Sequence, residues 1–94
     1  MKTEAEIRAR IEELKEKMRS IKDQARSVSY GEPNYKNHLL RSGYMRDTMM
    51  CYGDIAVLLW VLNEPISQEI DLLTRLDPDD EINARTYHER RRKS

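Results

Sequence analysis

Residues 55–62 read Ile-Ala-Val-Leu-Leu-Trp-Val-Leu, an uninterrupted apolar run in a chain of which 36% is charged. A helix that covers one side of a core shows a single apolar stripe. A helix that is apolar all the way round has to be enclosed on every side. The sequence therefore predicts that this segment has more than one neighbour, which limits the available folds more than any other feature does.

The chain has little apolar material with which to supply that cover. Its 94 residues allow one domain, with a single core that is only marginally sufficient. Leu, Ile, Val and Phe make up about a fifth of the sequence, where globular and disordered chains overlap, but a net charge of zero removes the self-repulsion typical of disorder. A second subunit would complete the core, so we expect a homo-oligomer.

The N-terminal segment has the apolar spacing of a coiled-coil helix. Its apolar residues alternate in steps of four and three, a heptad seam. Thr3 and Glu6 form a capping box at its start, and Gly31 with Pro33 interrupts the pattern at its end. We expect a helix over about residues 3–29. The seam consists of Ile7, Ile11, Leu14, Met18, Ile21, Ala25 and Val28.

A second long helix is predicted over residues 35–64, up to Pro65. Two helices of similar length joined by a short loop form an antiparallel hairpin. Gly43 and Gly53 fall outside the apolar seam, so each predicts a close helix crossing or a kink. The seam is Tyr44, Thr48, Cys51, Ile55, Leu58 and Leu62, and a second row is Met45, Met49, Tyr52, Ala56 and Leu59.

One neighbouring helix can cover only one side of this second helix. The apolar residues that point elsewhere are therefore predicted to lie in an oligomer interface. That predicted interface consists of Met50, Val57, Leu59, Trp60 and Val61.

Two shorter elements are predicted after Pro65. Apolar residues between Ile66 and Leu76 predict a third helix that begins after Ser67, and Asp77 with Pro78 predicts the start of a last one. The acids of residues 77–81 suit the positive end of that helix. The expected fold class is all-α: a long, coiled-coil-like antiparallel hairpin with a short third helix (1–76), then a polar helix or basic tail (77–94).

No catalytic or metal-binding pattern stands out in the sequence. His38 and His88 are far apart, and Cys51 is the single cysteine. The acids of residues 77–81 lack the glycine and the spacing of a calcium loop, and no phosphate-binding loop or nucleophile motif occurs. We expect a protein that is not an enzyme and that has no metal and no cofactor.

The location follows from the cysteine count and the apolar segments. A lone cysteine in an apolar stretch favours a reducing compartment. The charged N-terminus does not resemble a signal peptide. The longest apolar stretch, residues 49–62, contains Asp54 and is shorter than the roughly 20 residues of a membrane span. We expect a cytoplasmic protein that is not bound in a membrane.

Two tyrosines and several cations gather around the predicted hairpin loop. Aromatic rings and convergent cations suit a nucleotide or another planar anion. The alternative is that the tyrosines cap the hairpin and the cations are solvated, since a binding site also needs concavity. The candidate binding residues are Tyr30, Tyr35, Lys36, His38 and Arg41, with Lys22 and Arg26 approaching from the first helix.

The C-terminal residues 85–93 carry five Lys or Arg against Glu89. Such a tail can bind nucleic acid, but cations are also favourable at a helix C-terminus without any partner.

Three functions stay open on this evidence. The leading one is a small, non-enzymatic intracellular interaction protein, such as a regulator, adaptor or inhibitor, that binds a protein or other macromolecule as an oligomer. The second is a binder of nucleotides or similar ligands at the hairpin end. The third is a nucleic-acid binder acting through the tail.

Overall fold

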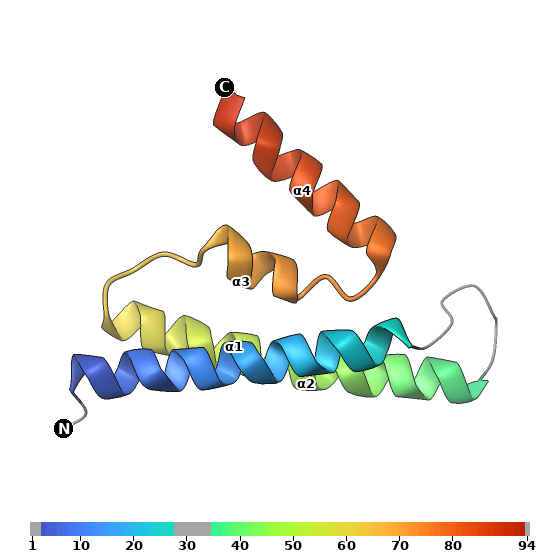
Figure 1. The fold of residues 1–94 in the computed structure, drawn as a ribbon, viewed down its shortest axis with the longest axis horizontal. Coiled ribbons are helices and arrows are strands. Elements are labelled where there is room, and N and C mark those ends of the chain that lie inside the picture. Colours follow the sequence, from blue (N-terminus) through green and yellow to red (C-terminus); the bar gives the residue numbers. More distant parts are fainter. Residues whose placement is uncertain (1–2, 28–34, 94) are drawn as a thin grey trace.

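The computed structural model describes residues 3–27 and 35–93, with the side chains of 35–37 and 93 left out. These residues form four helices and confirm the predicted all-α class (Figure 1). α1 and α2 are long and run side by side in opposite directions, and α3 and α4 follow on one side of this hairpin. The helices are α1 (Glu4–Arg26), α2 (Tyr35–Val61), α3 (Gln68–Leu73) and α4 (Pro78–Lys93).

α1 begins at the predicted cap and buries the predicted seam. The backbone N–H of Glu6 donates to Oγ1 of Thr3 at 3.2 Å. The helix ends at Arg26, slightly before the predicted end, and Val28 lies outside the described residues. Ile7 is partly buried. The buried seam residues are Ile11, Leu14, Met18, Ile21 and Ala25.

α2 ends at a Schellman motif, three residues before the predicted end. The N–H of Asn63 donates to the carbonyl of Trp60 at 3.0 Å, and that of Glu64 to the carbonyl of Leu59 at 2.9 Å. Asn63 has φ 58°, a left-handed conformation that Asn tolerates better than most residues. The helix therefore stops before Pro65 is reached.

The core lies mainly between α1 and α2 and is closed on one side by α3. Ile55 is fully buried, and Thr48 and Cys51 from the predicted seam of α2 are buried with it. Ser67 caps α3 by accepting from the N–H of Ile70 at 3.3 Å, as predicted, and Ile70 itself joins the core. α3 is thus part of the hydrophobic unit.

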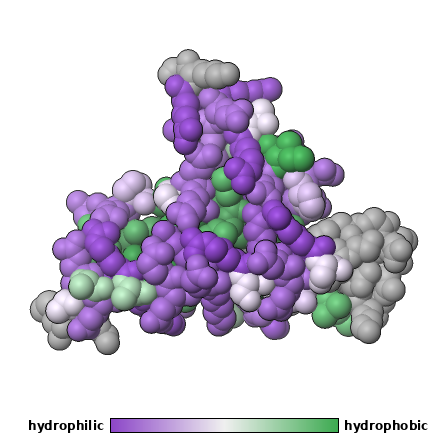
Figure 2. Space-filling model, viewed as in Figure 1, coloured by the Kyte–Doolittle hydropathy of each residue, from purple (hydrophilic) through white to green (hydrophobic). Residues whose placement is uncertain are grey.

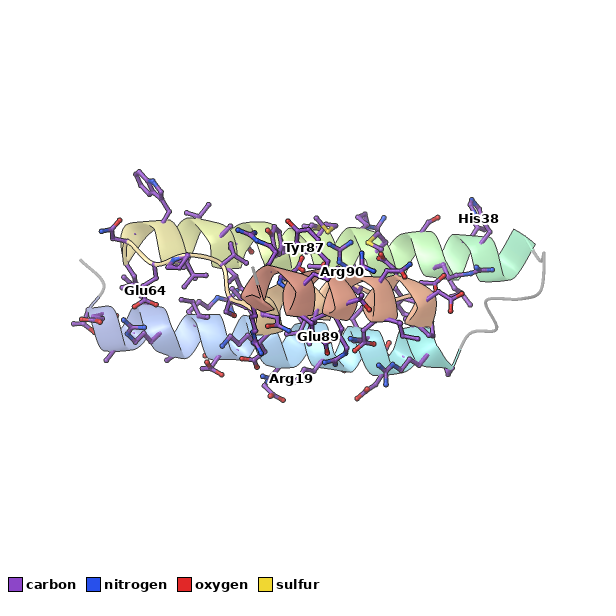
Figure 3. All side chains as sticks on the ribbon, turned by 90° about the horizontal axis from the view of Figure 1, so that it is seen from above. Arg19, His38, Glu64, Tyr87, Glu89 and Arg90 are labelled. Atoms are coloured by element: carbon purple, nitrogen blue, oxygen red, sulfur yellow. The ribbon has the colours of Figure 1, made fainter. Side chains whose placement is uncertain are left out.

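Ion pairs join the outer surfaces of these helices. Arg8 of α1 binds Glu64 after α2, and the hydrogen bond from Arg8 lowers the pKa of the Glu64 carboxyl. Arg19 of α1 donates to Glu69 of α3 at 2.6 Å and lowers the pKa of that carboxyl. Glu64 and Arg19 lie at separate points along the hairpin (Figure 3).

The molecule is flat and elongated, with extents of 47 × 36 × 15 Å and a radius of gyration of 15.0 Å. A compact chain of this length would have a radius of about 12 Å. On the face shown in Figure 2, hydrophilic residues cover most of the hairpin, and hydrophobic ones show mainly where α3 and α4 meet it. No helix in the described ranges combines the length and the hydropathy that a membrane crossing requires.

Candidate interaction surface

α2 has one covered face and one open face. The apolar run of residues 55–62 is only partly covered within the chain, as the sequence predicted for a segment with a single long neighbour. Ile55 is fully buried, but Trp60, five residues later on the same helix, is 80% exposed. α1 contacts only one side of α2, and α3 and α4 lie together on a neighbouring side, so the side opposite α1 has no cover within the described part of the chain.

The open face follows a second heptad pattern, which we call the outer seam. Its residues alternate in steps of four and three, as the covered residues do, but they lie on the opposite side of the helix from Ile55 at about 100° per residue. Val61 lies beside its last residue. The outer seam consists of Leu39, Gly43, Arg46, Met50, Gly53, Val57 and Trp60.

Four of the five predicted interface residues are exposed on or beside this seam. Met50 is 65% exposed, and Val57, Trp60 and Val61 are each more than half exposed. Sequence reasoning missed Leu39, which is exposed at the other end of the seam. The repeated spacing of four and three was the signal that would have identified it.

Leu59 was predicted to lie in the oligomer interface, and this prediction is wrong. Its side chain is only 6% exposed and packs in the core. Leu59 follows Ile55 by four residues, which places it about 40° around the helix from Ile55, toward the covered side. It therefore belongs with the buried residues and not with the open face.

The two glycines of the outer seam have open space around them among the described residues. A Cβ built on Gly43 or Gly53 meets nothing within 4 Å, and neither glycine has a positive φ. Each costs about 1 kcal/mol of helix stability relative to Ala. The sequence predicted a close helix crossing or a kink at each glycine. Because nothing among the described residues approaches either position, a close crossing would need a partner outside the described chain.

The candidate ligand site at the hairpin end is only partly within the described residues. Tyr30 lies outside them, as do the side chains of Tyr35 and Lys36. His38 is exposed and points away from α1 (Figure 3). His38 and the half-buried Arg41 line a groove of about 620 Å³. Met45, Leu76 and Asp77 also line this groove, and the last two were not predicted there.

Lys22 and Arg26 do not belong to that site, which corrects the sequence interpretation. Lys22 Nζ lies 3.2 Å from a Glu81 carboxylate oxygen and donates to the carbonyl of Leu72 at 3.0 Å. Arg26 binds the same carboxylate at 2.8 Å, and so does Arg85 of α4. Lys22 joins α1 to both α3 and α4, and Arg26 joins α1 to α4, whereas Arg85 pairs with Glu81 within α4.

The sequence placed Glu81 among the acids at the positive end of the last helix; it does lie in the first turn of α4, but its carboxylate also binds cations of α1, which was not predicted. Asp77 is the cap, since it accepts from the N–H of Asp79 at 2.8 Å. The side chain of Glu81 is only 12% exposed. Burial works to raise its pKa, but the hydrogen bonds from Arg85, Lys22 and Arg26 outweigh burial, so the pKa lies below its ordinary value. Glu81 is thus a charged anchor of α4.

The basic C-terminal segment is a helix that packs on α3. His88 Nε2 lies 2.8 Å from a carboxylate oxygen of Asp71, and Arg92 donates to the amide oxygen of Gln68 at 2.6 Å. Tyr87 and Arg90 lie on the side of α4 toward α2, and Glu89 lies on the side toward α1 (Figure 3). Part of the predicted basic cluster is therefore engaged within the chain.

Within the described residues, no three His, Cys, Asp or Glu side chains come together in a way that could hold a metal ion. Comparison of the chain with protein-family models, with characterised proteins and with solved structures gave no significant match.

Proposed function

We propose that this protein is a small, non-enzymatic helical interaction protein that binds a macromolecular partner through the outer seam of α2. One observation carries the proposal: the outer seam repeats the heptad spacing of the covered seam, yet its large apolar side chains are open to solvent. A regulator, an adaptor or an inhibitor would each work through such a surface.

The composition of the seam supports a specific interface. Trp60 is the only tryptophan of the chain and is 80% exposed, and Met50 is 65% exposed. Tryptophan and methionine are enriched in protein interfaces, and tryptophan is prominent among the residues that contribute most binding energy. An amphipathic helix that docks against a helix groove uses the same spacing. The favoured partner is therefore another apolar helix face.

Oxidative footprinting of Met50 and Trp60 tests this proposal. We expect both side chains to be protected when the purified protein is concentrated or when it is added to an extract of its native host, relative to dilute purified protein. Tyr87 on α4 is 56% exposed and serves as the internal control that keeps its reactivity. If Met50 and Trp60 stay as reactive as in dilute solution under both conditions, the proposal is wrong.

The groove at the hairpin end supports a second candidate function, binding of a nucleotide or similar anion. His38 and Arg41 line this groove of about 620 Å³, but Asp77 also lines it and opposes an anion. A rise in melting temperature with millimolar ATP, absent in Arg41→Gln, would support this candidate. Nucleic-acid binding by the tail has less support, because Arg85 and Arg92 bind Glu81 and Gln68.

A further inference from the structure

We infer that the partner of the outer seam is a second copy of this chain, whose α2 packs antiparallel to the first. The two-fold axis would pass α2 at the level of residues 51–52. This inference rests on the proposed function, since it names the occupant of the same surface. Three features support it: the order of small and large residues, the position of the charges, and the amount of exposed surface.

The order of small and large residues makes the outer seam complementary to itself. Gly43 and Gly53 are ten residues apart, and so are Met50 and Trp60. In an antiparallel pair centred at residues 51–52, Gly53 of one copy faces Met50 of the other, and Gly43 faces Trp60. Each glycine thus leaves room for one of the two most exposed large side chains on α2, and helices pack by inserting such side chains into gaps.

A parallel pair in register would lose this fit. It would place glycine against glycine and Trp60 against Trp60. The glycine layers would leave voids and the tryptophan layer would be overpacked, and both faults are costly. A Cβ on either glycine would meet nothing within 4 Å among the described residues, and the antiparallel pair gives both glycines a structural purpose.

The positions of the charges on the outer seam are also consistent with a two-fold axis at residues 51–52. Arg46 is the only charged residue of the outer seam, and its side chain is 73% exposed and 3.5 Å from the carboxylate of its neighbour Asp47. In the antiparallel pair Arg46 faces Val57 of the second copy. Asp54, one turn before Val57, is exposed and comes within reach of that guanidinium. In the dimer the Arg46 guanidinium thus gains, in addition to the carboxylate of Asp47, that of Asp54 from the second copy, which a wholly apolar partner would not provide.

The exposed surface is large enough for such a dimer. The chain exposes 6853 Å², whereas a compact monomer of 11.2 kDa exposes roughly 5700 Å². A standard interface removes about 800 Å² from each partner, and on α2 the outer seam supplies apolar surface through four side chains that are each more than half exposed, Leu39, Met50, Val57 and Trp60. Because α1 covers the opposite face of α2, the pair would be closed, with each α1 on the outside and both outer seams buried.

The first experiment measures mass by sedimentation velocity over a range of concentrations. We expect a species of twice 11.2 kDa at micromolar concentration. Gly53→Leu and Gly43→Leu should each raise the dissociation constant by at least about ten-fold, because each fills two gaps in a symmetric interface. These variants should still fold, since the added Cβ meets nothing within 4 Å among the described residues and glycine is the poorer helix former. Ala9→Leu on the exposed side of α1 is the matched control.

The second experiment tests orientation with single cysteines in a Cys51→Ala background. Met50→Cys and Gly53→Cys are made separately, mixed and mildly oxidised. The antiparallel pair predicts that a disulfide between the two different variants forms faster than either variant with itself. Faster self-linking of Met50→Cys than mixed linking would overturn the antiparallel register.

The experiments distinguish failure of the dimer inference from failure of the proposed function. A mass of 11.2 kDa at every concentration up to several hundred micromolar would overturn the inference that the partner is a second copy. If Met50 and Trp60 are nevertheless protected in the host extract, the proposed function stands and the partner is a different helix. If they are protected nowhere, both proposals are wrong.

Discussion

The junction between α1 and α2 and the attachment of α4 are built from opposite kinds of contact. The hairpin buries a continuous row of apolar side chains, including Met18 and Ile55 with no exposed surface. α4 buries one hydrophobic side chain, Ala84, and depends on polar groups around Glu81 and His88. Burial of apolar area stabilises without strict orientation, whereas ion pairs need correct geometry and depend on pH. We therefore expect the hairpin to define the global stability and α4 to open first.

The largest effect should come from Ile55→Ala in the hairpin core. Removing a fully buried Ile side chain costs about 2–5 kcal/mol. A domain of this size has roughly 5–14 kcal/mol in total, so the variant should melt much earlier. Urea unfolding followed by circular dichroism measures this, with Val57→Ala on the open face as the control. Equal losses for the two variants in dilute solution would contradict the distinction between the faces.

Glu81→Gln should detach α4 while leaving the hairpin folded. The change leaves Lys22 buried without its carboxylate, at a cost of about 1–3 kcal/mol. Hydrogen exchange should show faster exchange in α4 with little change in α1. Glu89→Gln, an exposed position on the same helix, is the control. A uniform loss of protection across all helices would mean that α4 is part of one cooperative unit with the hairpin.

Acid should weaken the same attachment in the unmodified protein. The pKa of Glu81 is lower in the folded chain than its ordinary value of 4.5. Its contribution to stability is therefore complete above about pH 4.5 and is lost as the pH falls through the lower, folded pKa. Exchange of the α4 amides between pH 6 and pH 3, corrected for the intrinsic rate, should reveal this loss. In Glu81→Gln the extra loss at low pH should be reduced.

Thr48→Val should strengthen the hairpin. Thr48 is fully buried, and its hydroxyl has no hydrogen-bond partner among the described residues. Valine has nearly the same shape, so the change removes an unsatisfied polar group at a gain of about 1 kcal/mol. Thermal unfolding should show a melting temperature several degrees higher. A lower melting temperature would show that the hydroxyl has a partner, such as a bound water.

The smallest effect should come from His88→Ala. His88 and Asp71 are about three-quarters buried, and their contact joins α4 to α3 at 2.8 Å. We expect a loss of about 0.5–1 kcal/mol, confined to the C-terminal part of α4.

Removing residues 86–94 should likewise lower the melting temperature by only a few degrees. A larger loss would place the tail within the main core and would weaken the contrast between the two regions.

Local signals in the sequence identified the helices and much of the core. The seam from Ile11 to Ala25 is buried as the heptads predicted, because side chains at those spacings share one helix face. Thr3, Ser67 and Asp77 each accept the expected backbone hydrogen bond. Such caps depend on residues two or three positions apart, so no knowledge of the tertiary structure is needed.

The candidate site was predictable only in part. The composition of α2 predicted more apolar surface than one neighbour can cover. The exposed side chains of that helix include Met50, Val57, Trp60 and Val61. Leu59 was misplaced because it belongs to a second apolar row at the side of α2. Its burial depends on how α1 and α3 lie across that helix, which the heptad spacing does not specify.

The sequence by itself determined the first three helices, the starting point of all the helices and the excess apolar surface of α2, since propensity, capping and periodicity act over a few residues; whether the C-terminal segment is a helix or a tail was decided by the structure. Only the tertiary structure decided which row of α2 is covered, and that Lys22 and Arg26 meet Glu81 more than fifty residues later in the chain. Contacts at such separations follow from the angles at which helices pack. Those angles result from the combined fit of many side chains, and no single motif encodes them.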